Sequence, residues 1–170
     1  QARLYAPSIA DRAKPGQFVE VQVNAGTDPF LRLPLSICAV DTAAGTVDVL
    51  YEAVGPKSRA LSDVAVGASL ALMGPLGKRG FSPPASGRRA VLVGGGIGIP
   101  PLLFFGKSLL DSGYAEEVVL LAGARNAGKH LSDDLMRPSA SRWERCSDDG
   151  SMGHKGLVTD LLSTELDGAD

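Results

Sequence analysis

The stretch that decides the fold, residues 89–101, is RAVLVGGGIGIPP. Its first five residues form a short and nearly all-apolar run, which is typical of a strand buried in a parallel sheet. Glycines follow directly, and the two prolines suit the first turn of a helix, where a missing N–H costs nothing. The stretch therefore predicts a strand, a glycine loop and a helix in that order.

The segments after this stretch complete the pattern of an α/β domain. Apolar residues between 102 and 110 give the predicted helix one apolar side. Residues 117–122 repeat the buried-strand pattern, a third strand is expected to end near Cys146, and residues 157–166 are expected to form another helix. A strand, loop, helix and strand in this order form a βαβ unit, whose crossover should be right-handed.

The glycine loop is a candidate binding site. Glycines between a parallel strand and a helix let the backbone approach a pyrophosphate closely, while the N–H groups at the helix start attract its charge. The predicted phosphate-binding residues are Gly94, Gly95, Gly96, Ile97 and Gly98. Because Pro101 stands where the last glycine of GxGxxG would fall, the loop is not a standard fingerprint, and a tight turn without a ligand is the alternative.

Polar residues are also expected at the ends of the later strands. Arg125 follows the second strand at the carboxyl edge of the sheet, where α/β domains bind ligands, so it can pair with a phosphate or a ribose. A solvated arginine is an equal alternative. Asp148 and Asp149 follow the third strand, but neighbours in a loop usually point apart, and His154 is expected to be an exposed loop residue. None of these three is assigned a catalytic role.

The first 73 residues show short strands separated by turns. In residues 17–23, Val19, Val21 and Val23 alternate with polar residues, which is the period of a half-buried strand. Further strands are expected at 31–40, 47–51 and 69–73, with turns at 26–29 and 43–45 and a short helix near 60–62. This half of the chain is therefore predicted to be an antiparallel meander or β-barrel.

One strand of this barrel contains a proline. Pro34 has no N–H, so its strand must lie at an edge or a bulge, which leaves backbone donors and the Ser36 hydroxyl free for a flat polar ligand such as an isoalloxazine ring. An edge strand that merely avoids aggregation is the competing interpretation.

Composition limits the classes of function. The pattern changes near the middle of the 170 residues, which predicts two domains, residues 1–87 and 88–170. With 17 Lys and Arg against 19 Asp and Glu, there is no positive field to attract nucleic acid or an anionic membrane. No apolar run approaches the ~20 residues of a membrane span and the start lacks a signal peptide, so a cytoplasmic protein is expected.

The cysteines exclude one kind of metal site. Cys38 and Cys146 lie far apart and fit neither a disulfide framework nor a CxxC pair. An iron–sulfur cluster normally takes four protein ligands, so these two thiols cannot hold one, and no metal site is predicted within this chain.

Successive segments of the chain resemble the electron-transfer subunit of the class 1B dihydroorotate dehydrogenases, a branch of the ferredoxin-NADP reductase superfamily. The segments are GQFVEVQV, RLPLSICAVD, VDVLYEAVGPKSRALS, MGPLGKRGF, VLVGGGIGIPPLL and SDDGSMGHKGLVTDLL. The resemblance implies an N-terminal antiparallel β-barrel that binds FAD and a parallel-sheet α/β domain that binds NAD. It also implies a two-iron, two-sulfur cluster held by cysteines beyond residue 170, so the chain is expected to be a fragment.

The resemblance assigns flavin-binding residues. Pro34, Leu35 and Ser36 match the family's motif Arg-Pro-Ile-Ser, with Ser36 near the reactive nitrogen of the flavin. Leu33 stands in place of the motif's arginine. Arg32 comes one residue early and is expected to point away from the flavin phosphates unless a bulge turns it inward.

A second group of departures concerns the same ligand. Leu50 and Tyr51 match another flavin-contacting strand, but Glu52 follows where the family usually has arginine. Lys57 and Ser58 replace Gly-Thr at the pyrophosphate. Ser58 can still donate a hydrogen bond, and either Lys57 or Arg59 can supply the missing charge.

The resemblance implies a function and leaves alternatives. NADH would bind across the glycine loop and reduce the flavin, which would pass electrons to an iron–sulfur centre and a catalytic flavoprotein partner in a hetero-oligomer of pyrimidine biosynthesis. The choice between NADH and NADPH is open. The alternatives are a reductase subunit of a sulfhydrogenase or of an NADH-dependent ferredoxin-NADP oxidoreductase, a scaffold module that has lost flavin, and a regulator that senses NADH without electron transfer.

Overall fold

The structure is a computed structural model that describes residues 1–23, 31–83 and 88–167. It divides into two compact units, Gln1–Phe81 and Ser82–Asp170. The sequence had predicted the boundary at residue 87, whereas the first unit ends at Phe81. The turn expected at 26–29 lies outside the described residues. The ligand that each unit binds stays a prediction.

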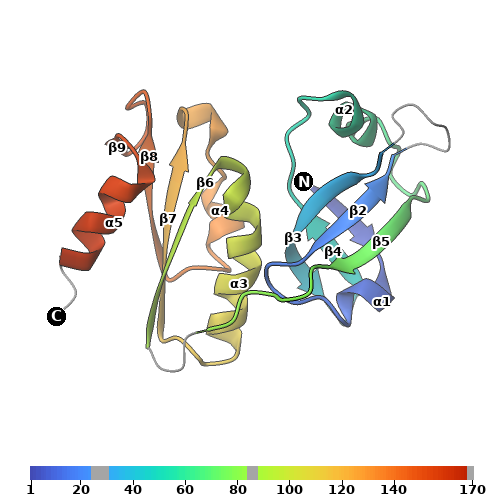
Figure 1. Ribbon diagram of the computed structural model, residues 1–170, viewed down its shortest axis with the longest axis horizontal. Helices are drawn as coiled ribbons and strands as arrows, with labels where there is room; N and C mark the ends of the chain where they lie inside the picture. The colour runs from blue at the N-terminus through green and yellow to red at the C-terminus, as the bar shows by residue number, and fades with distance from the viewer. Residues whose placement is uncertain (24–30, 84–87, 168–170) are drawn as a thin grey trace. The chain divides into compact units, whose positions relative to one another are not determined.

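The first unit is an antiparallel sheet that curls into a half-barrel (Figure 1). Its elements are β1 (Ala2–Tyr5), α1 (Pro7–Ala10), β2 (Phe18–Gln22), β3 (Leu33–Asp41), β4 (Thr46–Val49), α2 (Pro56–Ser62) and β5 (Ala71–Leu76). The five strands lie in the order β1-β4-β3-β2-β5. The two short helices lie at opposite ends of the sheet (Figure 1). The predicted antiparallel class is confirmed, whereas β1 and α1 had not been predicted.

The predicted alternation in the first unit matches its core. Val19 and Val21 of β2 are 1% and 0% exposed, and Val47 and Val49 of β4 are buried as well. Glu20, between the two valines of β2, is only half-buried. Alternate side chains of β2 therefore fill the inside of the curl, whereas in β4 Asp48 is buried together with its two valine neighbours.

Strand β3 changes its partner along its length. Residues Leu33 to Ser36 pair with β2, whereas residues Ile37 to Asp41 pair with β4, with an irregular register near Ile37. Among the described residues, the Pro34 half of β3 thus has a neighbouring strand on one side only. A proline is tolerated there because the missing N–H faces the side that carries no strand pairing.

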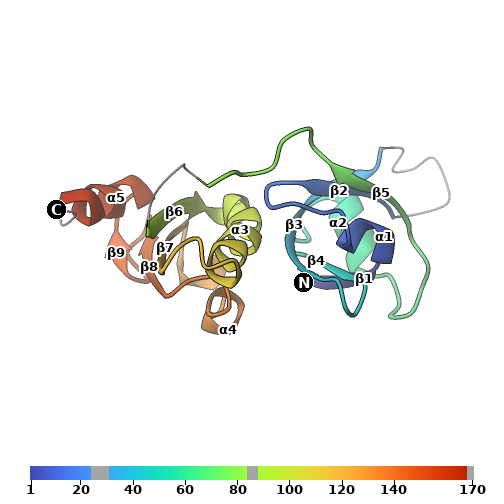
Figure 2. The ribbon, with the colours of Figure 1, turned by 90° about the horizontal axis from the view of Figure 1, so that it is seen from below.

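The second unit is a parallel α/β layer structure. Its elements are β6 (Arg89–Gly95), a 3-10 turn (Gly96–Gly98), α3 (Ile99–Asp111), β7 (Glu117–Ala124), a 3-10 turn (Ala127–Lys129), α4 (Asp133–Met136), β8 (Arg142–Ser147), β9 (His154–Lys155) and α5 (Val158–Asp167). The strands lie in the order β6-β7-β8-β9, all parallel. Helices α3 and α4 cover one face of the sheet and α5 covers the other (Figure 2). The predicted parallel α/β class is confirmed.

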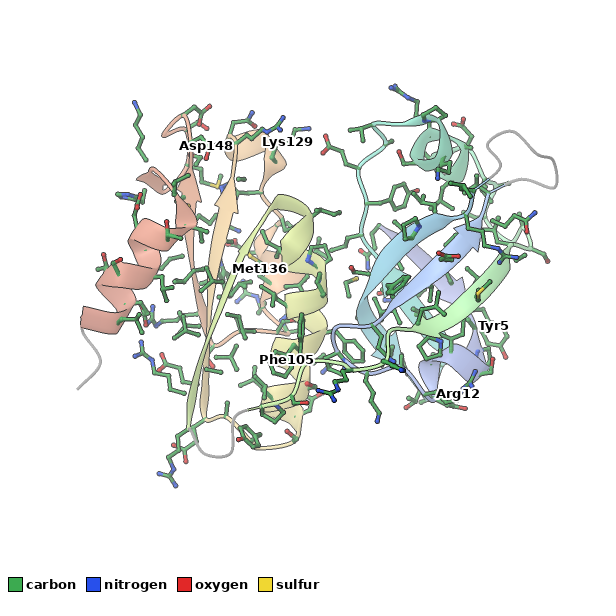
Figure 3. The ribbon with its side chains drawn as sticks, viewed as in Figure 1. Tyr5, Arg12, Phe105, Lys129, Met136 and Asp148 are labelled. Atoms are coloured by element: carbon green, nitrogen blue, oxygen red, sulfur yellow. The ribbon has the colours of Figure 1, made fainter. Side chains whose placement is uncertain are left out.

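Packing against the central strand β7 holds these layers together. Val119 and Leu121 of β7 are fully buried. They pack beside Cys146 of β8 and Leu161 of α5. On the other face, α4 inserts Met136, which is 0% exposed (Figure 3). Nowhere in the described parts of either unit is a helix long and apolar enough to cross a membrane.

Candidate functional site

The glycine loop lies at the carboxyl end of β6. Gly95, Gly96 and Gly98 are exposed, and Ile97 is 71% exposed. Gly96 has a φ of +52°, which favours glycine. A Cβ added at Gly96 or Gly98 would meet no atom within 4 Å, so a ligand can approach the backbone of this loop.

Gly94 has a different role in the same loop. A Cβ at this position would lie 2.7 Å from Leu102 Cδ1 and 3.3 Å from the Gly98 carbonyl oxygen. The glycine therefore lets the end of β6 pack against the start of α3. Its contribution to a ligand site is through this packing, whereas Gly95 to Gly98 form the accessible surface.

The start of α3 offers few backbone donors. Pro100 and Pro101 are its second and third residues and have no N–H, as expected for prolines in a first helical turn. The N–H of Ile99 donates to the carbonyl of Gly96. Donors for a phosphate must therefore come mainly from the preceding loop, and the helix N–H groups contribute less than the sequence suggested.

The loops after β7 and β8 meet at the same carboxyl edge. Arg125 is exposed directly after β7, and its carbonyl accepts a hydrogen bond of 3.4 Å from the N–H of Asp149. Lys129 and Asp148 both lie at this end of the unit (Figure 3). The edge thus carries side chains of both charges. The role of Arg125 stays a prediction.

Ser151 links these two loops. Its Oγ accepts a 2.8 Å hydrogen bond from the N–H of Ala127 and donates a 2.5 Å hydrogen bond to the Asp149 carboxylate. The N–H of Ser151 donates to the same carboxylate oxygen at 2.9 Å. These bonds hold the pKa of Asp149 below its usual value. This link was not predicted from the sequence, although the spacing Asp-x-Ser is typical of such turns.

The candidate flavin edge lies on the first unit. In β3, Leu35 and Ile37 are buried, whereas Pro34 is exposed and Ser36 is half-buried. Pro34 and Ser36 therefore share the outward face of the strand. Because Leu35 points inward, it can contact a ligand on that face only through its backbone.

The second predicted flavin segment lies outside its expected strand. Strand β4 ends at Val49, so Leu50 and Tyr51 come just after it, and the expected continuation of the strand to Tyr51 is wrong. Leu50 is buried at 7% exposure. The Tyr51 hydroxyl accepts a long hydrogen bond of 3.4 Å from Ser62 Oγ in α2. The chain turns toward α2 here and leaves the sheet.

The start of α2 shows which of its polar groups are engaged. Ser58 is 6% exposed, and its hydroxyl accepts from the N–H of Gly55 at 3.0 Å and donates to the Gly55 carbonyl at 3.1 Å. Lys57 Nζ donates to the carbonyl of Arg32 at 3.2 Å. Arg59 Nη2 donates to the carbonyl of Val54 at 2.8 Å. Their roles as flavin ligands stay predictions.

The two thiols are removed from solvent. Cys38 and Cys146 are both free and buried, and burial raises the pKa of Cys38 to about 12. Such thiols are poor nucleophiles and poor metal ligands at neutral pH. In the part of the chain that the structure describes, no group of three or more His, Cys, Asp or Glu side chains could hold a metal ion.

Sequence comparison identifies relatives of this chain. No protein-family model matches it. The electron transfer subunit of dihydroorotate dehydrogenase B (NAD(+)) from Desulforamulus reducens is 37% identical over 162 residues, covering 95% of this chain and 61% of the relative. The corresponding subunit from Bacillus caldolyticus is 36% identical over 156 residues, covering 91% and 59%. The chain thus spans about three fifths of the length of the curated relatives it matches.

Structure comparison agrees with the fold. An NADH-dependent reduced ferredoxin-NADP oxidoreductase aligns with a TM-score of 0.79 and 28% identity, covering 98% of this chain and 58% of that one. A ferredoxin NADP+ reductase from Neisseria gonorrhoeae with bound FAD and NADP aligns with a TM-score of 0.68 and 20% identity, covering 91% and 65%. The second likeness shows the fold alone.

Proposed function

Because the chain is homologous to the electron transfer subunits of dihydroorotate dehydrogenase B and has a ferredoxin reductase-like fold, we propose that it is an electron-transfer module. Its first unit binds FAD, and its second unit binds a nicotinamide dinucleotide. Electrons pass from the nicotinamide to the flavin and then to an iron–sulfur centre and a catalytic flavoprotein subunit that lie outside this chain.

The glycine loop carries the nucleotide part of the proposal. Gly96 and Gly98 lack side chains at an exposed turn, and no atom occupies the space that a Cβ would take. Backbone N–H groups of such a turn can approach a pyrophosphate closely. Arg125, at the same edge of the sheet, would pair with a phosphate or ribose.

The outward face of β3 carries the flavin part. Pro34 and Ser36 lie on the outward face of the half of β3 that pairs with a strand on one side only among the described residues, so a flat ring has both backbone groups and a hydroxyl to contact. When bound, the flavin would accept a hydride and release its electrons singly. Ser36 would donate a hydrogen bond to the ring, and the backbone of Leu35 would support it.

Absorbance and reduction measurements test the proposal. The purified chain is mixed with FAD, freed of unbound flavin and scanned for flavin absorbance, after which NADH is added without oxygen. We expect retained flavin that is bleached by NADH. A colourless chain that binds no added FAD would support the scaffold alternative, and nucleotide binding without bleaching would support a regulator that senses NADH.

A second candidate has specific support. The TM-score of 0.79 to an NADH-dependent reduced ferredoxin-NADP oxidoreductase favours a reductase subunit of that kind of complex. The sequence identity of 37% to the dihydroorotate dehydrogenase subunit, against 28% to that oxidoreductase, favours the first candidate. Copurification of the full-length protein with its partner subunit would distinguish the two.

A further inference from the structure

Arg145 of β8 contacts both loops at the carboxyl edge of the second unit. Its Nη2 donates a 3.0 Å hydrogen bond to the carbonyl of Leu131, in the loop after β7, and pairs with Asp133 at the start of α4. Its own carbonyl lies against the loop after β8, since a Cβ at Gly153 would come within 1.9 Å of that oxygen. One residue therefore supports the two loops that border the proposed nucleotide site.

His130 lies beside this guanidinium. It follows the 3-10 turn Ala127–Lys129, and neither of its ring nitrogens is open to solvent or forms a hydrogen bond within the described residues. Nε of Arg145 is also buried without a hydrogen bond there. Buried polar groups are usually hydrogen-bonded, so this contact between the loop and β8 is a weakly satisfied one.

The charges around the His130 ring oppose its protonation. Burial, followed by the cation of Arg145, lowers the pKa of His130 below 6.5, against a smaller opposite effect of the Cys146 backbone. The hydrogen bond from Arg145 lowers the pKa of Asp133, so that carboxylate is charged at neutral pH and already pairs with the guanidinium. Lys129, the preceding residue, is a second cation on the loop. A proton on His130 would therefore add a positive charge beside Arg145.

The loop that ends at His130 also carries the proposed nucleotide ligand Arg125. Between the two residues, the N–H of Ala127 donates to Ser151 Oγ at 2.8 Å, and the N–H of His130 donates to the Ala127 carbonyl at 3.3 Å. Arg125 itself is exposed. Because the segment is short and bonded to itself, a shift at its His130 end would displace Arg125 as well.

We propose that Arg145 and His130 are positioning residues that hold the loop after β7 in place for the nucleotide, and that protonation of His130 releases this loop. The inference rests on the proposed nucleotide site. A neutral ring can stay packed beside Arg145. A charged ring is repelled by the guanidinium and needs hydrogen-bond acceptors, which water supplies once the loop opens. The second unit should thus bind nucleotide less tightly in mild acid.

The test follows NAD+ binding by calorimetry at about pH 7.5 and about pH 5.5, on either side of the ordinary histidine pKa. The wild-type chain should bind NAD+ about threefold to tenfold less tightly at the lower pH. Roughly tenfold is the limit for one group that has its ordinary pKa in the open loop and stays neutral in the closed loop. His130→Gln should lose this pH dependence. His154→Gln, at the other of the two histidines, is the matched control and should keep it. Circular dichroism at each pH checks that the chains are folded.

Arg145 is tested at about pH 7.5, where His130 is neutral. Arg145→Met removes the hydrogen bond to Leu131 and should weaken NAD+ binding about threefold to tenfold. Arg145→Lys keeps the charge and one donor position, so it should recover part of the loss. Arg137→Met, at an exposed arginine just after α4, is the control and should bind NAD+ like the wild type.

Three results would overturn the inference while leaving the proposed function in place. They are a wild-type affinity that is equal at the two pH values, a His130→Gln chain with the pH dependence of the wild type, and an affinity unchanged by Arg145→Met. Arg145→Gln takes the place of Arg145→Met if that chain does not fold. A wild-type chain that binds no NAD+ at either pH would instead refute the proposed function itself.

Discussion

The carboxylate of Glu165 pairs with the guanidinium of Arg142, joining the last turns of α5 to the start of β8. The same carboxylate pairs with Arg89 at the start of β6, and its side chain is only 8% exposed. Helix α5 is thereby anchored across the amino ends of two strands. Opening this pair would leave a nearly buried charge without a partner.

Glu165→Gln should lower the free energy of unfolding by about 1.5–3 kcal/mol, because hydrogen bonds to charged groups carry about this much. Glu144→Gln is the control, since Glu144 also pairs with Arg142 but is half exposed, and exposed pairs contribute about 0–1 kcal/mol. Urea unfolding measures both. Equal effects of the two variants would contradict the anchoring role of Glu165.

His130 should make the protein less stable in mild acid. Burial and the neighbouring Arg145 lower the pKa of His130 below its ordinary value of 6.5, and neither ring nitrogen has a hydrogen-bond partner in the described structure. Folding therefore favours the neutral ring. This stability is present above pH 6.5 and is lost as the pH falls below it.

His130→Gln should remove most of this loss. The free energy of unfolding would be measured in urea at about pH 7.5 and about pH 5.5, on either side of the ordinary histidine pKa. His154→Gln is the control at the exposed second histidine. The explanation fails if His154→Gln, and not His130→Gln, removes the pH dependence.

Two glycines of the glycine loop should respond differently to alanine. Gly94→Ala forces a Cβ to within 2.7 Å of Leu102, so it should destabilise the second unit by about 1–3 kcal/mol. Gly98→Ala meets no atom within 4 Å and should leave the fold intact. It should nevertheless weaken NADH binding severalfold, because in the proposed site a methyl group at residue 98 would stand where the phosphate binds. Melting and nucleotide titration separate the two effects, and normal NADH binding by Gly98→Ala would contradict a phosphate site there.

The features that the sequence predicted well are local patterns. The run RAVLV before the glycines predicted β6 correctly, and the alternation of Val19 and Val21 predicted β2. In both strands the spacing of apolar residues along the sequence indicates which side chains are buried. Strand β1 was missed because Ala2–Tyr5 has only 4 residues, too few for its alternation to stand out, and it is held by pairing with β4, far along the chain. Long-range pairing of this kind is not contained in local sequence.

Parts of the candidate site were beyond sequence reasoning for a related reason. In the sequence, the alternation of Val47 and Val49 continues to Tyr51, but in the structure the chain leaves the sheet after Val49. The engagement of Ser58 by Gly55 and of Ser151 by Asp149 depends on loop conformation, which residue types alone do not specify. Only the structure shows which hydroxyl is already used.

Ser151→Ala should loosen the carboxyl edge of the second unit. The change removes the link from Ala127 to Asp149, so the loops after β7 and β8 would no longer be held together. We expect NADH binding to weaken about threefold to tenfold, a loss typical of one hydrogen bond. Ser163→Ala, on an exposed turn of α5, is the control. Identical nucleotide titrations for the two variants would show that the link does not prepare the site.

Ser36→Ala should slow the reduction of bound flavin by NADH. The hydroxyl lies on the outward face of β3, and in the proposed site it donates to the ring, so its loss removes a hydrogen bond that stabilises the reduced ring. A slowing of about tenfold is expected for one such donor. Stopped-flow measurement without oxygen gives the rate of flavin reduction, and a flavin titration separates a slower reduction from weaker flavin binding.

Ser8→Ala in α1, at the other end of the sheet from α2, is the control and should keep the wild-type rate. A Ser36→Ala chain that is reduced as fast as Ser8→Ala would remove Ser36 from the reaction and leave the flavin ring to be positioned by the backbone of β3 alone.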